Sequence, residues 1–177
     1  MKVFELALKG VKALTPKVYD DERGYFFESY NTTANEILGV TFEQDNESLS
    51  MKGVFRGLHY QLPPYDQNKL IRCVEGKVID FVVDIRKDSK TFGQWLSFVL
   101  SVGNKHQLFC PVGFAHGFFV LTDTARVLYK VDKPYSIEHE RGIHPLDPEI
   151  GLEITGDVLL SDKDRVAPYL KDIKDLL

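Results

Sequence analysis

Ten short strand-like segments follow one another along this 177-residue chain, and they constrain its fold more than any other feature. Residues of turn type separate many of them, as in Asp21-Glu22-Arg23-Gly24, Pro63-Pro64, Glu75-Gly76 and Gly103-Asn104. Many short strands at this spacing are typical of an all-β barrel or sandwich. The predicted strands span residues 15–19, 24–30, 41–50, 53–61, 69–73, 77–84, 95–101, 107–111, 117–121 and 126–131.

Only two segments favour a helix. Residues 32–38 follow Asn31, and a C-terminal segment that opens at Ser161 is expected to form a helical tail. With 44% hydrophobic and 12% aromatic residues, a chain of this length can bury one sizeable core. We therefore expect one domain that spans residues 1–177.

Composition excludes several classes of partner. No stretch approaches the roughly 20 apolar residues of a membrane helix, and the N-terminus lacks a secretion signal, so a cytoplasmic protein is expected. The net charge is −4 with interspersed signs, which offers no basic stripe for nucleic acid. Cys73 and Cys110 lie in apolar segments, where buried reduced thiols without a catalytic role are expected.

Two histidines are the main candidates for a functional site. His59 lies in Arg56-Gly57-Leu58-His59-Tyr60-Gln61, and His116 ends the turn Pro111-Val112-Gly113-Phe114-Ala115-His116. That turn resembles half of a cupin metal signature, but Tyr60 stands where the second histidine is wanted and no nearby glutamate follows, so no metal is expected. A histidine without metal can act as a base near neutral pH, or can simply be a hydrogen-bonded barrel residue.

Several motifs in a fixed order resemble the dTDP-4-dehydrorhamnose 3,5-epimerase family over about residues 16–164. They are Arg56-Gly57-Leu58-His59-Tyr60-Gln61, Gln67-x-Lys69-Leu70, Val83-Asp84-Ile85-Arg86, Thr91-Phe92-Gly93-Gln94-Trp95 and Pro111-x-Gly113-Phe114-Ala115-His116-Gly117-Phe118. The resemblance implies a cupin-type jelly-roll β-barrel and a homodimer whose N-terminal strands cross to the partner's sheet. It also implies epimerisation, without a cofactor, of dTDP-4-dehydro-6-deoxy-D-glucose to dTDP-4-dehydro-L-rhamnose, a step of dTDP-L-rhamnose biosynthesis.

The same resemblance assigns four catalytic roles. It makes His59 the base, Asp164 its carboxylate partner, Lys69 the group that stabilises the enolate oxygen and Tyr129 the proton donor. Each residue has a simpler interpretation from the sequence alone. Asp164 could cap the helix that starts at Ser161, Tyr129 could be a core aromatic, and Lys69 could be a surface charge.

Binding roles follow from the resemblance too. Tyr135 corresponds to the aromatic residue that stacks on thymine, and Arg23 or Glu28 could serve the other subunit. Strict strand alternation would place Arg56 and His59 on opposite faces, so we expect a bulge at Gly57. The remaining residues that match nucleotide or sugar contacts are Gln44, Asn46, Arg56, His116, Glu140 and Lys163.

Other functions remain open from the sequence. A mono-epimerase or a 3,4-ketoisomerase would use the same base on a related nucleotide sugar, although Tyr129 at the family's position favours double epimerisation. A sugar-binding cupin without activity and a metal-dependent cupin enzyme are further alternatives. The chain also departs from the family pattern, because Gly142-Ile143-His144-Pro145 lacks an expected tryptophan and leaves His144 without a role.

Overall fold

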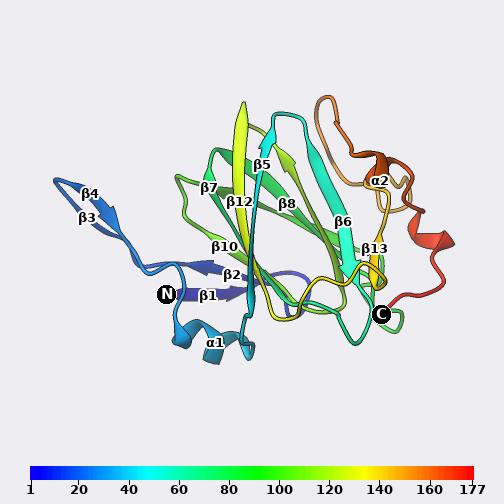
Figure 1. Ribbon diagram of the computed structural model, residues 1–177, viewed down its shortest axis with the longest axis horizontal. Helices are drawn as coiled ribbons and strands as arrows, with labels where there is room; N and C mark the ends of the chain where they lie inside the picture. The colour runs from blue at the N-terminus through cyan, green and yellow to red at the C-terminus, as the bar shows by residue number, and fades with distance from the viewer.

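The computed structural model describes residues 1–177 as two antiparallel sheets packed face to face, with a small separate hairpin (Figure 1). The six-stranded sheet has the order β1 (Lys2–Glu5), β2 (Lys12–Thr15), β10 (Gln107–Cys110), β7 (Lys69–Glu75), β12 (Thr124–Val131) and β5 (Gln44–Met51). The five-stranded sheet has the order β13 (Glu140–Gly142), β6 (Phe55–Gln61), β11 (Phe114–Val120), β8 (Lys77–Asp84) and β9 (Trp95–Ser101). The hairpin consists of β3 (Tyr19–Asp21) and β4 (Gly24–Phe26).

The main core lies between the two large sheets. On β8, Val78 and Val82 are fully buried in this core, whereas Phe81 and Val83 belong to a second cluster with Leu170 from the C-terminal segment. The five-stranded sheet is therefore covered on both faces, which explains why β8 and β11 are apolar almost throughout. A charged side chain inside such a strand needs a specific partner.

The predicted all-β organisation is confirmed, and several elements match closely. Helix α1 (Thr32–Leu38) and strands β8 and β9 have the predicted bounds. The short strands β1 and β13 were not predicted, and the strand predicted over residues 15–19 is wrong, because β2 ends at Thr15 and β3 begins only at Tyr19. The two cysteines, Cys73 and Cys110, are free and buried, as expected.

The C-terminal segment is less helical than the sequence suggests. Helix α2 (Asp162–Arg165) has only four residues, and a 3-10 turn follows at Leu170–Asp172. Pro168 disfavours helical backbone at the residue before it, so the helix ends early. The rest of the segment instead places apolar side chains against the five-stranded sheet, and Tyr169 packs edge-on against His144. No helix in the structure is long and apolar enough to cross a membrane.

The β3–β4 hairpin projects away from both large sheets (Figure 1). Three of its aromatic side chains, Tyr19, Tyr25 and Phe26, are each more than half exposed. Isolated two-stranded hairpins are marginally stable in water, and exposed apolar groups that lie together are typical of interaction surfaces.

Candidate active site

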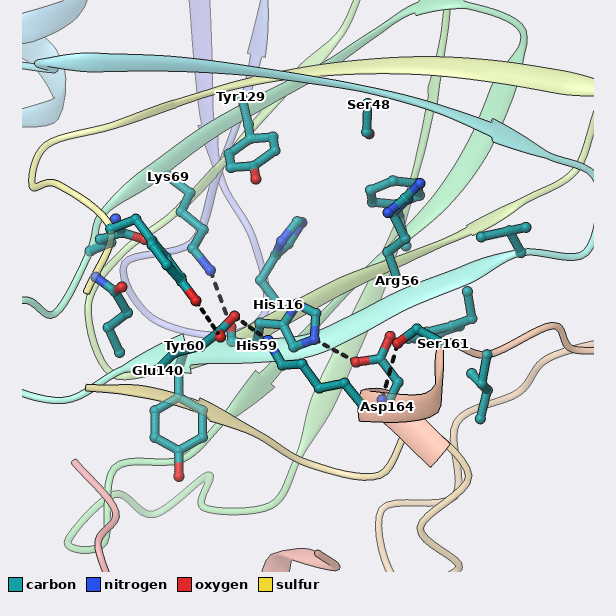
Figure 2. A pocket seen from close by; sticks show the side chains of 18 of the residues that line it. Ser48, Arg56, His59, Tyr60, Lys69, His116, Tyr129, Glu140, Ser161 and Asp164 are labelled. Carbon is teal, nitrogen blue, oxygen red and sulfur yellow. Dashed lines mark hydrogen bonds and ion pairs between the residues drawn. The ribbon is translucent and has the colours of Figure 1, made fainter. Parts of the chain in front are cut away.

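A cavity of about 620 Å³ opens between the sheets, and most of the predicted site residues line it (Figure 2). One wall comes from β6, β11 and β13 of the five-stranded sheet, and the opposite wall from β5, β7 and β12. The segment around α2 closes one side. The predicted residues that line the cavity are His59, Lys69, Tyr129, Asp164, Arg56, His116, Tyr135, Glu140 and Lys163.

A bulge at Gly57 brings Arg56 and His59 to the same cavity. In the pairing of β6 with β11, His59 lies opposite His116 and Arg56 lies opposite Phe118, so two residues of β6 face Gly117. Gly57 has a φ of +126°, and a Cβ atom there would lie 2.5 Å from the Gly117 Cα atom. Only glycine fits this position, and the predicted bulge is confirmed.

His59 and Asp164 form an imidazole–carboxylate pair at 2.6 Å between Nε2 and Oδ1. The cap at α2 is formed by Ser161, whose Oγ accepts a hydrogen bond from the Asp164 backbone amide at 3.1 Å. Burial raises the pKa of Asp164, but hydrogen bonds from His59, Ser161 and the Gly57 amide outweigh it and leave that pKa below its ordinary value. The carboxylate therefore stays ionised and can stabilise a protonated imidazole.

Lys69 is buried at the side of the cavity, where its Nζ atom donates to the His59 carbonyl oxygen at 3.1 Å. Burial lowers the pKa of Lys69, because the ammonium loses solvation. An ammonium carries three donors, so two N–H groups remain for a ligand oxygen. The simpler interpretation of Lys69 as a surface charge is wrong.

Tyr129 projects into the cavity from β12, on the wall opposite His59 (Figure 2). Burial raises the pKa of Tyr129, and the nearby Arg56 charge only partly offsets this. The phenol is therefore protonated near neutral pH. A protonated phenol on one wall and a paired imidazole on the other can exchange protons with opposite faces of a flat intermediate.

Polar side chains form a network at the cavity mouth. Glu140 makes an ion pair with Lys163 and accepts a hydrogen bond from the Tyr135 hydroxyl at 2.9 Å. The Tyr135 ring is 55% exposed, so a planar ligand group can reach it. Arg56, an exposed residue of the cavity lining, donates from Nε to the Ser50 hydroxyl at 2.8 Å.

Four of the predicted binding residues do not line the cavity within one chain. Arg23 lies at the tip of the hairpin, where it pairs with Asp21, and Glu28 accepts a hydrogen bond from Asn31. Gln44 and Asn46 lie on β5 and are hydrogen-bonded to each other at 2.8 Å. Arg23 and Glu28 thus lie on or just after the β3–β4 hairpin, and Gln44 and Asn46 lie on the edge strand β5. None of the four lines the cavity.

One buried residue beside the site was not predicted from the sequence. Asp80 is completely buried on β8 and lies 2.9 Å from the Nε2 atom of His116. A carboxylate inside the apolar run Val78-Ile79-Asp80-Phe81-Val82 was the signal that could have identified it. No three His, Cys, Asp or Glu side chains come together at a spacing that could hold a metal ion.

Comparisons with known proteins agree on one family. The family model described as dTDP-4-dehydrorhamnose 3,5-epimerase matches residues 5–172. A dTDP-4-dehydrorhamnose 3,5-epimerase of Shigella flexneri is 52% identical over 93% of both chains. The crystal structure of dTDP-6-deoxy-D-glucose-3,5-epimerase from Legionella pneumophila, in complex with dTDP-4-keto-L-rhamnose, is 44% identical with a TM-score of 0.93, over 98% of this chain and 94% of that one.

A 3'-monoepimerase of Streptomyces bikiniensis, solved in complex with dTDP-quinovose, is more distant. It is 32% identical, with a TM-score of 0.89 over 94% of this chain and 87% of that one. The fold shared with these structures is the cupin-type jelly roll that the motifs predict. The family model covers most of the sequence, and several relatives match nearly full length at more than 40% identity. The chain therefore belongs to the dTDP-4-dehydrorhamnose 3,5-epimerase family.

Proposed function

We propose that this protein epimerises dTDP-4-dehydro-6-deoxy-D-glucose at C3 and C5 to give dTDP-4-dehydro-L-rhamnose, by proton transfer and without a cofactor. The observation that carries this proposal is the arrangement of three groups around one cavity. The His59–Asp164 pair and the Tyr129 phenol occupy opposite walls, and the Lys69 ammonium lies in the same cavity. A sugar-binding module would not need all these groups together.

The mechanism follows from the acidity of the substrate. A 4-ketone acidifies the C–H bonds on both neighbouring carbons, so His59 can remove a proton while the negative charge moves to O4. Asp164 stabilises the imidazolium that forms, and Lys69 stabilises the enolate oxygen. Tyr129 then donates its proton to the same carbon from the other face, which inverts that centre. His59 and Tyr129 return to their starting states by exchanging protons with solvent, and the sequence repeats at the second carbon.

The binding roles are assigned from charge and position. Arg56 and Lys163 supply cations for the pyrophosphate, and the exposed Tyr135 ring offers a stacking surface for the base. His116, beside His59, contacts the sugar or the phosphate. Thymine differs from uracil by one methyl group, worth about 0.8 kcal/mol when buried, so discrimination between the two bases is expected to be modest.

The direct test is proton NMR of the nucleotide sugar incubated with the protein in D₂O. A double epimerase is expected to replace both the C3 and the C5 protons with deuterium, because each centre passes through an enolate. Exchange at a single carbon would instead identify a mono-epimerase. A protein that exchanges neither proton but still binds the nucleotide would be a binding module, and the proposal would fail.

We also propose that the protein is a cytoplasmic homodimer in which the β3–β4 hairpin crosses to the partner. The hairpin exposes Tyr19, Tyr25 and Phe26. Strand β5, at the edge of the six-stranded sheet, has one side free to pair with another strand. A hairpin that packs along β5 of the partner would bring Arg23 and Glu28 near Gln44 and Asn46, which extend the same face of β5 as the cavity residue Ser48.

Mixed dimers test this arrangement. If Arg23 serves the partner's cavity, unfolding and refolding Arg23→Ala together with His59→Ala is expected to restore about a quarter of wild-type activity, since half of the dimers are hybrids and each has one intact site. Each variant refolded alone is the control. If both residues belong to the same cavity, the mixture will be no more active than Arg23→Ala alone at half concentration. A monomer in analytical ultracentrifugation would contradict the dimer itself.

A further inference from the structure

Asp80 forms a second imidazole–carboxylate pair, which lies beside the first. His116 and His59 are cross-strand partners on β11 and β6. His116 lines the cavity and its Nε2 atom lies 2.9 Å from an Asp80 carboxylate oxygen. Asp80 itself is absent from the cavity lining and has no exposed surface, so it can act on a ligand only through its neighbours.

The environment of Asp80 makes its charge costly. Val78 and Val82, on the same face of β8, belong to the apolar core between the sheets. The His116 Nε2 atom lies 2.9 Å from both Asp80 oxygens, but it forms a hydrogen bond only with Oδ2, so Oδ1 has no hydrogen bond of its own. A buried carboxylate with an unsatisfied oxygen is destabilising unless positive charges lie near it. Burial raises the pKa of Asp80, and His116 and Lys69 act in the opposite direction. Lys69 reaches this part of the fold through its hydrogen bond to the carbonyl oxygen of His59, the cross-strand neighbour of His116.

Lys69 needs such a counter-charge. Burial lowers the pKa of Lys69, while Cys110 on β10, Asp80 on β8 and Glu140 on β13 act in the opposite direction. Burial raises the pKa of Cys110 to about 12, so this thiol is neutral at pH 7. Glu140 is already engaged with Lys163 and Tyr135 at the mouth. The other charged or titratable side chains that line the cavity with Lys69 are Glu47, Arg56, His59, Tyr60, His116, Tyr129 and Asp164.

We infer that Asp80 is a positioning residue, a buried carboxylate behind the cavity wall that holds the His116 ring in place and supplies the counter-charge of Lys69. The inference rests on the proposed function, because it assigns Lys69 the task of stabilising the enolate oxygen. Asp80 thus supports the charge that develops at O4, whereas Asp164 supports the base. The two carboxylates serve different steps of the same proton transfer.

The test is the pH profile of Asp80→Asn, a variant that keeps the shape of the side chain and removes its charge. We expect kcat to fall about 10- to 100-fold with little change in KM. The basic limb of the kcat profile is expected to move about one unit to lower pH, because Lys69 loses its proton more readily without the carboxylate. An unshifted basic limb would overturn the inference.

Asp84→Asn is the matched control. Asp84 lies on the same strand and is equally buried, but it bonds Arg86, Ser89 and Thr91 and does not line the cavity. This variant is expected to lower the melting temperature and to leave the basic limb of the pH profile in place. An equal shift in both variants would mean that the effect is structural, which would also overturn the inference.

A double-mutant cycle gives a readout that does not depend on activity. Lys69→Met removes one of the two cationic groups near Asp80, so we expect this variant to melt below the wild type. Adding Asp80→Asn to it is expected to raise the melting temperature again. Simple additivity of the two destabilising effects would contradict the pairing. Because this cycle measures stability, it separates a failure of the inference from a failure of the proposed reaction, which the D₂O experiment on the wild type reports.

Discussion

Replacement of His59 by alanine is expected to abolish exchange at both C3 and C5. Two histidines line the cavity, His59 and His116, and His59 is the one that is paired with Asp164. The proposed mechanism uses this one base for both carbons. Loss of a general base costs about 10²- to 10⁴-fold in rate, so the C3 and C5 signals should persist in D₂O for the duration of a wild-type assay. Proton NMR of the nucleotide sugar gives the measurement at both positions at once.

His106→Ala is the appropriate control for this variant. His106 packs against Phe98 and does not line the cavity, so its removal is expected to leave exchange unchanged. If His59→Ala still exchanged one carbon at the wild-type rate, a second base would be acting there. The single-base mechanism would then be wrong, although the protein would remain an epimerase.

Substitution of Tyr129 by phenylalanine is expected to separate exchange from inversion. His59 and Lys69 remain, so the enolate still forms and deuterium still enters from the His59 face. The opposite face has lost its proton donor, and formation of the inverted product should fall by about 10²- to 10⁴-fold. NMR reports deuterium uptake, and coupling to a reductase specific for the L-rhamno product reports inversion in the same sample.

The comparison for Tyr129→Phe is Tyr169→Phe, since Tyr169 packs against His144 away from the cavity. Tyr169→Phe should change neither the rate of deuterium exchange nor the rate of inversion. Equal loss of exchange and inversion in Tyr129→Phe would mean that the phenol is needed to form the enolate. Retention of both would mean that the proton on that face comes from another group, and Tyr129 would lose its role as the acid.

Alternating apolar residues and turn residues predicted most of the fold. The pattern works for β8 and β9, where burial on one or both faces dictates the side chains. It fails for β1 and β13, which have only four and three residues and little buried surface. The predicted helical tail begins at Ser161 as expected but is shorter than the sequence suggests, because tertiary packing of Leu170 and its neighbours against the sheet outweighs local helical preference.

The site was predictable to different extents. His59 and His116 stand out locally, and the spacing of Arg56 from His59 required a bulge that the structure contains. The contact between His59 and Asp164 spans 105 positions, so no local pattern could reveal it and only family resemblance pointed to it. Asp80 was missed because strand patterns describe exposure and packing, whereas its meaning depends on residues brought to it by other strands.

The close approach of β6 and β11 at Gly57 and Gly117 limits how this protein can change over time. A Cβ atom at Gly117 would lie 2.7 Å from the Arg56 carbonyl oxygen, just as one at Gly57 would collide with Gly117. Substitutions elsewhere in the cavity exchange one contact for another and leave the strands where they are. A single added carbon at either glycine would instead shift the alignment of the two strands, and with it the spacing of His59, His116 and Arg56. New substrate preferences are therefore open to mutation at the cavity mouth, while these two positions are closed to it.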